Sequence, residues 1–183
     1  MHKYLITSKE FYTDTPSVFC TILYEKLKEY MPTYVLYRDK LNPNYNTQAA
    51  HFVEICSKFE SIKSFIHQDV SLAKELNATG VHLSSKQFDE IYHAKNLGLE
   101  VIISTHTHKE VKQAQKLGVD AVTYSPIFES PQKGEPKGLD DLNELLGVCD
   151  INVFALGGII EESHVDIIKT TKAYGFASIR YFR

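Results

Sequence analysis

The side chains best suited to chemistry in this sequence are cations and small hydrogen-bond donors. Arg38 and Lys40 stand two residues apart after an apolar run, so an extended chain places both on one side. Gly157 and Gly158 end another apolar run and precede a helical pattern, which leaves backbone N–H groups free. Lys133 lies in a loop rich in Gly and Pro. Because guanidinium, ammonium and backbone N–H groups all suit phosphate, we expect a phosphorylated small-molecule ligand.

Further candidates follow other apolar runs. Ser104 and His106 show the same two-residue spacing, and Ser130 lies in the loop that carries the lysine. Ser178 and Ile179 end the last apolar run. Long loops between regular elements often carry function. We therefore add these five residues to the predicted anion-binding set.

A structural role is the alternative for each of these residues. Arg38 and Lys40 could form a solvated turn paired with Asp39. The two glycines could serve a tight turn that binds nothing, and histidines in a polar loop often have no function. His82 lies inside an apolar run, so we expect a hydrogen-bonded core histidine there.

Composition excludes several functional classes. The 183 residues carry a net charge of −3, so the composition does not indicate a basic surface for nucleic acid or an anionic membrane. No apolar run approaches the ~20 residues of a membrane span. Carboxylates are scarce near the expected strand ends, so metal-dependent hydrolysis is poorly supported. We expect no signal peptide, and the three separated cysteines indicate buried thiols in a reducing cytoplasm rather than a metal site: Cys20, Cys56 and Cys149.

Eight short apolar segments must position these groups. We expect strands at residues 3–8, 34–38, 62–66, 80–83, 101–104, 120–124, 151–156 and 174–179, with helical patterns between them. This alternation is typical of an α/β fold and favours a closed (β/α)8 TIM barrel over an open doubly wound sheet, with one domain over residues 1–183. Ligands of such barrels bind at the C-terminal strand ends, where the candidate residues stand.

The chain is short for this fold, which typically has ~250 residues. Nothing after Phe182 can form an eighth outer helix. We therefore expect the last strand to leave apolar surface uncovered, and a second copy to cover it in a homodimer.

Five segments resemble motifs of the thiamine-phosphate synthase and TenI family, in the family's order. Tyr37-Arg38-Asp39-Lys40 resembles its RDK motif, and Gly80-Val81-His82-Leu83 resembles GVHL. Ser104-Thr105-His106-Thr107 resembles STHT, residues 125–133 (SPIFESPQK) resemble GPVFPTxTK, and residues 154–159 (FALGGI) resemble xAIGGI. Each motif is weak alone, but five at fitting spacings make the resemblance specific.

The resemblance implies a barrel enzyme of thiamine biosynthesis, most simply a transferase. In the synthase, a pyrimidine diphosphate loses pyrophosphate, and the nitrogen of thiazole phosphate captures the pyrimidine carbon. The TenI branch instead tautomerises a thiazole phosphate. The resemblance assigns Arg38, Lys40, Ser104 and Lys133 to the diphosphate, and Gly157, Gly158, Ser178 and Ile179 to the thiazole phosphate.

The chain departs from the family where the resemblance implies Mg²⁺ ligands. Gln68 and Gln87 stand at the positions of the expected carboxylates, and His67 precedes the first of them. Asp69 can substitute only if the register shifts by one residue. Amides are poor replacements for carboxylates at Mg²⁺, so we expect no metal site, and a Mg²⁺ cofactor is doubtful.

Two other positions separate the chain from both branches. Leu36 replaces a glutamine that the synthases carry two residues before the arginine. Tyr124 and Ser125 stand where TenI proteins carry a histidine near strand six, and His67 or His106 could replace it.

Three functional hypotheses follow. The first is an enzyme that couples or tautomerises thiazole phosphate. The second is a phosphate-binding or regulatory member that has lost catalysis together with the magnesium site. The third is an unrelated phosphosugar isomerase on the same fold, because fold does not determine function.

Overall fold

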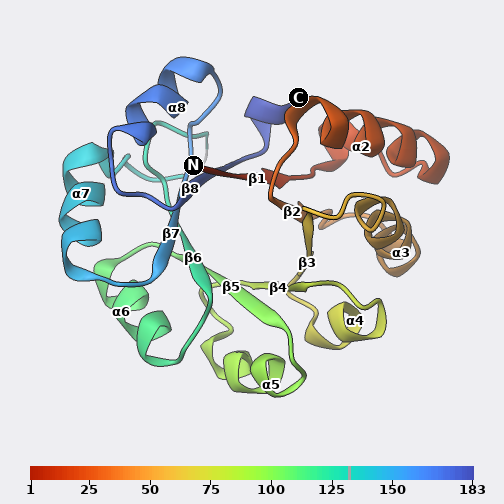
Figure 1. The fold of residues 1–183 in the computed structure, drawn as a ribbon, viewed down its shortest axis with the longest axis horizontal. Coiled ribbons are helices and arrows are strands. Elements are labelled where there is room, and N and C mark those ends of the chain that lie inside the picture. The colour runs from red at the N-terminus through yellow and green to blue at the C-terminus, as the bar shows by residue number, and fades with distance from the viewer. Residues whose placement is uncertain (132) are drawn as a thin grey trace.

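Eight parallel strands close into a barrel in the computed structural model, which describes residues 1–131 and 133–183. Each strand pairs with the next along the chain, and β1 also pairs with β8 (Figure 1). The predicted (β/α)8 barrel is therefore confirmed. The strands are β1 (His2–Ile6), β2 (Tyr34–Tyr37), β3 (Lys63–His67), β4 (Gly80–Leu83), β5 (Glu100–Thr105), β6 (Ala121–Tyr124), β7 (Asn152–Leu156) and β8 (Gly175–Ser178).

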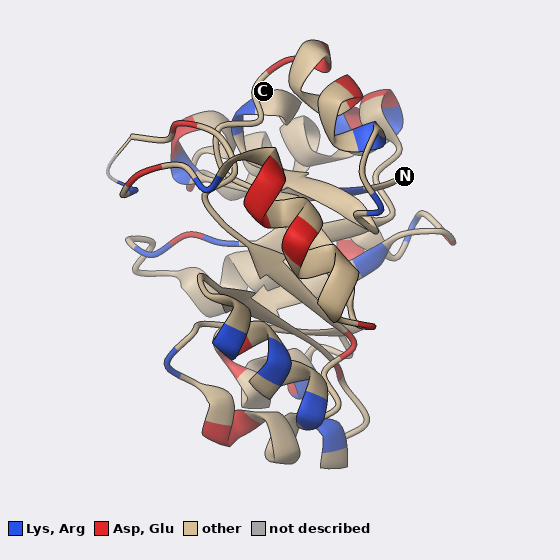
Figure 2. Cartoon of the chain, turned by 90° about the vertical axis from the view of Figure 1, so that its left-hand side faces the viewer, with Lys and Arg blue, Asp and Glu red and all other residues tan. Residues whose placement is uncertain are grey.

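The helices surround the barrel on its outside (Figure 1). They are α1 (Lys9–Tyr12), α2 (Pro16–Tyr30), α3 (Tyr45–Cys56), α4 (Val70–Glu75), α5 (Ile91–Asn96), α6 (His108–Lys116), α7 (Gly138–Val148) and α8 (Glu162–Lys169), with 3-10 turns η1 (Phe88–Glu90) and η2 (Arg180–Phe182). The short α1 after β1 was not predicted. Figure 2 shows the charges on this outer layer, with acidic residues along α7 and lysines along the neighbouring α6.

Alternation along the strands separates two apolar layers. Outward-facing residues pack against the helices, whereas inward-facing residues fill the barrel. The interior is largely aromatic: the Phe154 ring centroid lies 5.2 Å from that of Tyr4 and 5.0 Å from that of Tyr34, and Phe65 stacks beside Tyr34. Because these rings fill the barrel, a ligand can enter only at its ends.

The end of the chain differs from the sequence-based expectation. In residues 179–183, β8 is followed by η2 and by no outer α-helix. Phe182 is nevertheless fully buried and stacks on Phe176 of β8, which is 1% exposed. Tyr30 of α2 meets the Phe182 ring edge to face at 5.2 Å. The prediction of an uncovered apolar face is therefore wrong, because Phe182 covers β8 where an outer helix would otherwise pack. An uncovered face therefore no longer supports the predicted homodimer.

Two other expectations concern the cysteines and the membrane. All three cysteines are free, but only Cys56 is buried, while Cys20 and Cys149 are partly exposed. None of the helices described has the length and apolar character needed to cross a bilayer.

Candidate functional site

A cavity of about 620 Å³ opens at the C-terminal ends of the strands. Its walls come from the ends of β1 to β8 and from the loops that follow them. We call it the barrel-mouth cavity. Every candidate residue of the sequence analysis lines it: Arg38, Lys40, Lys133, Ser104, His106, Ser130, Gly157, Gly158, Ser178 and Ile179. Only Gln132, within the fourth motif, falls outside the described residues.

Three cations gather on one side of this cavity. Arg38 and Lys40 follow β2, and Lys133 comes from the loop between β6 and α7. Burial lowers the pKa of Arg38, and the charge of Arg38 lowers the pKa of Lys40, with smaller contributions from burial and Lys133. Among the described residues, no carboxylate forms a salt bridge with any of the three. Their positive charge is therefore available to an anion.

Asp39 does not neutralise its neighbours. It is 7% exposed, and its Oδ1 accepts a hydrogen bond from the backbone N–H of Leu41 at 3.1 Å. Arg38 is held in place instead through its backbone N–H, which donates to the Thr7 hydroxyl at 3.0 Å. The alternative of a solvated turn in which Asp39 pairs with both cations is therefore not what the structure shows.

Two histidines line the cavity beside these cations and stay neutral. Burial, reinforced by the charges of Arg38 and Lys40, lowers the pKa of His67 to about 4. Burial lowers the pKa of His82 to about 3, with smaller contributions from His67 and Arg38. Neither ring therefore adds charge at neutral pH.

His82 connects the barrel core to the cavity. Its Nδ1 lies 2.8 Å from the Tyr4 hydroxyl, and its Nε2 lies 2.9 Å from the Ser104 hydroxyl. His82 is the only described partner of the buried phenol, so the phenol donates to Nδ1 rather than leave its proton unpaired. The Nε2–H then donates to Ser104, whose own proton remains free for a ligand. His82 is thus the hydrogen-bonded core residue that the sequence predicts, and it also orients Ser104.

His106 directly follows β5, two residues after Ser104. Its Nδ1 lies 3.2 Å from the backbone oxygen of Ser125 and 3.3 Å from the Ser125 hydroxyl. This contact leaves Nε2 without a partner among the described residues. His106 can therefore present one ring nitrogen to a ligand.

Gly157 and Gly158 follow β7 with φ of +103° and +72°, a region that favours glycine. The loop after β6 packs directly on them, since the N–H of Ile127 donates to Leu156 and that of Phe128 donates to Gly157. The N–H groups of Gly157, Gly158 and Ile179 donate to no other described residue. The two glycines therefore form a tight turn and also leave backbone N–H groups free to bind an anion.

Replacing Gly158 by alanine is expected to destabilise the protein by about 2–5 kcal/mol, because a left-handed conformation costs about 1–2 kcal/mol and overpacking about 1–3 kcal/mol. An added Cβ would lie 2.5 Å from the backbone oxygen of Glu129 and 2.6 Å from the Phe128 Cβ. Urea unfolding measures the change. Gly147→Ala is the control: this helical glycine has open space around it, and its replacement is expected to be neutral or stabilising. Equal stability of the two variants would contradict this packing.

Ser178 differs from its predicted role. Its hydroxyl donates to the backbone oxygen of Ile159 at 2.7 Å and accepts from the N–H of Tyr181 at 3.1 Å. The hydroxyl proton that the resemblance assigns to a phosphate is therefore used inside the protein. Ser178 joins the loop after β7 to the end of the chain, and the free donor at this position is the N–H of Ile179.

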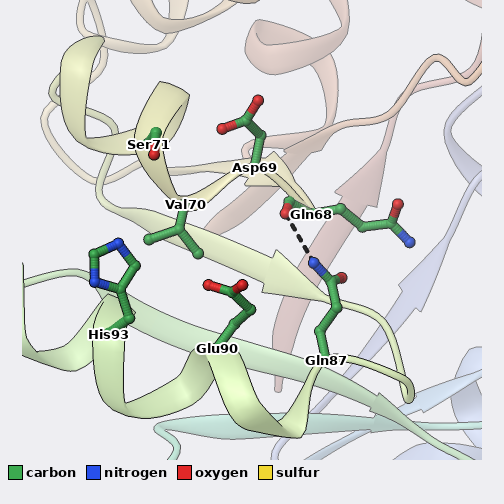
Figure 3. A pocket seen from close by; sticks show the side chains of 7 residues that line it. All are labelled: Gln68, Asp69, Val70, Ser71, Gln87, Glu90 and His93. Atoms are coloured by element: carbon green, nitrogen blue, oxygen red, sulfur yellow. Dashed lines mark hydrogen bonds between the residues drawn. The ribbon is translucent and has the colours of Figure 1, made fainter.

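The expected magnesium positions lie beside a second cavity of about 570 Å³, between α4 and α5 (Figure 3). Gln68 lines both cavities, whereas Gln87 and Asp69 line only the second. The Nε2 of Gln87 donates to the backbone oxygen of Gln68 at 3.0 Å. Asp69 accepts from the N–H of Leu72 at 2.8 Å and so caps α4. Asp69 therefore caps a helix and does not line the barrel-mouth cavity with the cations, and the absence of a metal site stays a prediction.

Some residues of the cavity are not among the predicted site residues. Sequence patterns leave the role of His67 open and place His82 in the core, yet both line the cavity, as do Glu10 and Phe11 of the unpredicted α1. Strand alternation could have predicted the position of His67. His67 lies two residues after the inward-facing Phe65, and strand alternation places it on the same side. No local pattern pointed to α1.

Comparison with known proteins agrees with this geometry. The thiamine-phosphate synthase of Persephonella marina is 29% identical over 144 residues, which cover 75% of this chain and 68% of that protein. A relative from Aquifex aeolicus is 38% identical over 117 residues, 62% of this chain and 61% of its own length. The matches thus span about two thirds of these curated relatives.

A solved structure shares the fold. Thiamine phosphate pyrophosphorylase from Pyrococcus furiosus superposes with a TM-score of 0.79 at 23% identity, covering 97% of this chain and 85% of that one. The family described as thiamine monophosphate synthase matches residues 3–182, which argues against the hypothesis that the chain is unrelated to this family. Barrel, motifs and match together lead to one conclusion: this chain belongs to the thiamine monophosphate synthase/TenI family.

Proposed function

We propose that this protein is a transferase of thiamine biosynthesis that couples thiazole phosphate to a pyrimidine diphosphate. The observation that carries the proposal is the cluster of Arg38, Lys40 and Lys133, which faces the barrel-mouth cavity without carboxylate partners among the described residues. Such a cluster suits a leaving group that gains negative charge. The relatives named as thiamine-phosphate synthases support the same reaction.

The two ligands occupy opposite sides of the cavity in this proposal. The cations and the Ser104 hydroxyl bind the diphosphate, while the N–H groups of Gly157, Gly158 and Ile179 bind the thiazole phosphate. The carbon–oxygen bond to the diphosphate breaks, and pyrophosphate leaves with the bonding electron pair. The thiazole nitrogen lone pair then forms the new bond to the pyrimidine carbon. No protein nucleophile is required.

Tautomerisation of a thiazole phosphate is the second candidate, and His67 is the observation that favours it. A neutral imidazole in the cavity, with its pKa lowered to about 4, can accept a proton at neutral pH. His106 offers a second ring nitrogen. This candidate needs no diphosphate, so the two reactions differ in which ligands bind.

Calorimetric titration with thiazole phosphate, followed by the pyrimidine diphosphate, tests the proposal. We expect both to bind and thiamine phosphate to form when both are present. Binding of thiazole phosphate alone, with its isomerisation, would favour the tautomerase. Binding of thiazole phosphate without turnover would identify a non-catalytic or regulatory member, and no binding of either ligand would contradict the proposed function.

A further inference from the structure

We propose that the barrel-mouth cavity binds its diphosphate as a free anion, with Arg38, Lys40 and Lys133 in place of a divalent cation. The inference rests on the proposed function, because it concerns the same diphosphate. It follows from the donors that surround the site. Three observations support it: the side-chain amide of Gln87 is engaged, the carboxylate of Asp69 caps a helix, and cations outnumber carboxylates in the described lining of the cavity.

Gln87, at one of the expected magnesium positions, has no side-chain oxygen to offer, and neither it nor Gln68 carries the negative charge that Mg²⁺ prefers. The Gln87 Oε1 accepts hydrogen bonds from both the N–H and the hydroxyl of Ser84, each at 3.0 Å. Its Nε2 donates to the backbone oxygen of Gln68, which occupies that carbonyl as well (Figure 3). Gln87 thus ties the loop after β4 to the loop after β3 by polar contacts that a metal would have to break.

Asp69 has another role and lies at the other cavity. Asp69 caps α4 through the N–H of Leu72 and lines the second cavity together with Glu90 and His93. Figure 3 shows the Asp69 carboxylate pointing away from Gln87. In residues 1–131 and 133–183, no three His, Cys, Asp or Glu side chains come together as a metal site. A hard cation such as Mg²⁺ therefore lacks the carboxylate oxygens that it prefers.

The charge at the barrel mouth also disfavours a metal. Glu10 is the one carboxylate in the described lining, against Arg38, Lys40, Lys133 and Arg180. A divalent cation would enter a region where the charges of Arg38 and Lys133 already lower the pKa of Lys40. A free diphosphate has the complementary charge and bonds well to a guanidinium and two ammonium groups. Mg²⁺ would instead compete with these side chains for the diphosphate oxygens.

Titration with inorganic pyrophosphate tests this inference on the intact protein. We expect binding in the presence of EDTA, and an affinity that stays the same or falls when excess Mg²⁺ replaces the chelator. Arg38→Ala is expected to lower the affinity in EDTA by about 10- to 100-fold, as for one charge-assisted hydrogen bond. Lys86→Ala is the matched control, since Lys86 is an exposed lysine after β4 that does not line the cavity.

The outcomes separate this inference from the proposed function. Binding of pyrophosphate that requires Mg²⁺ would overturn the inference and leave the coupling reaction standing. A loss of affinity in Lys86→Ala as large as in Arg38→Ala would also overturn it, because general surface charge would then explain the binding. No pyrophosphate binding in either buffer would contradict both the inference and the assigned diphosphate site. Titration with thiazole phosphate would then test separately whether the other proposed ligand binds.

Discussion

Arg38→Ala is expected to reduce kcat for thiamine phosphate formation by about 100- to 1000-fold, the range seen when one transition-state donor is removed. The partly buried guanidinium has no carboxylate partner among the described residues and faces the cavity next to Lys40. Negative charge grows on the pyrophosphate as its bond breaks, so a fixed cation there stabilises the transition state more than the bound substrate. The loss in kcat should therefore exceed the loss in affinity.

Steady-state kinetics together with calorimetry measure the two losses separately. Lys133→Ala is expected to behave in the same way, because it belongs to the same cluster. Arg38→Lys keeps the charge but loses the planar fork, and it should fall between wild type and Arg38→Ala. Lys86→Ala should retain wild-type kinetics. If Arg38→Ala and Lys133→Ala only raise the dissociation constants, the proposed transition-state role is wrong.

Acidification from pH 7 to pH 4 is expected to cost the protein several kcal/mol of unfolding free energy. Burial holds the pKa of His82 near 3 and that of His67 near 4 in the folded protein, below the ordinary value of 6.5. The unfolded chain therefore binds more protons than the folded protein between these values, and stability falls as the pH drops below about 6.5. For the fully buried His82 the loss by pH 4 is about 3 kcal/mol.

Urea unfolding at a series of pH values measures this dependence. His82→Gln breaks the contacts to Tyr4 and Ser104, so its stability at pH 7 is expected to be lower. The slope of stability against pH between 6.5 and 4 is the informative quantity, and it should become shallower in this variant. His93→Gln removes an exposed histidine and should leave the slope as in wild type. An unchanged slope in His82→Gln would show that the buried imidazole does not control the acid sensitivity.

Pyrophosphate binding and the kinetics of Arg38→Ala and Lys133→Ala all depend on the same cluster of cations. The cavity places neutral histidines beside cations that outnumber the carboxylates in its described lining, so its net positive charge persists at neutral pH. That charge is the physical reason to expect a diphosphate without a metal. It also explains why the three cations should behave as a unit rather than as independent contacts.

Local patterns in the sequence determined the strands and the ends of the barrel that carry polar groups. Short apolar runs bounded by glycine and polar residues mark parallel strands, and their two-residue period shows which residues share a side. This is why Arg38, Lys40, Ser104 and His106 could be placed at one cavity before any contact was known. The glycines after β7 were identifiable because a close approach of backbone requires them.

The tertiary structure decided what local patterns do not encode, namely the partners that come from distant parts of the chain. Tyr4 and His82 are 78 residues apart, yet their hydrogen bond sets the orientation of Ser104. Phe182 covers β8 because Tyr30 and Phe176 meet it in space. Asp69 became a helix cap, and the Ser178 hydroxyl became a link between loops. The sequence thus determined which chemistry could gather at the barrel mouth, whereas packing and hydrogen bonding between distant segments decided which groups remain free to perform it.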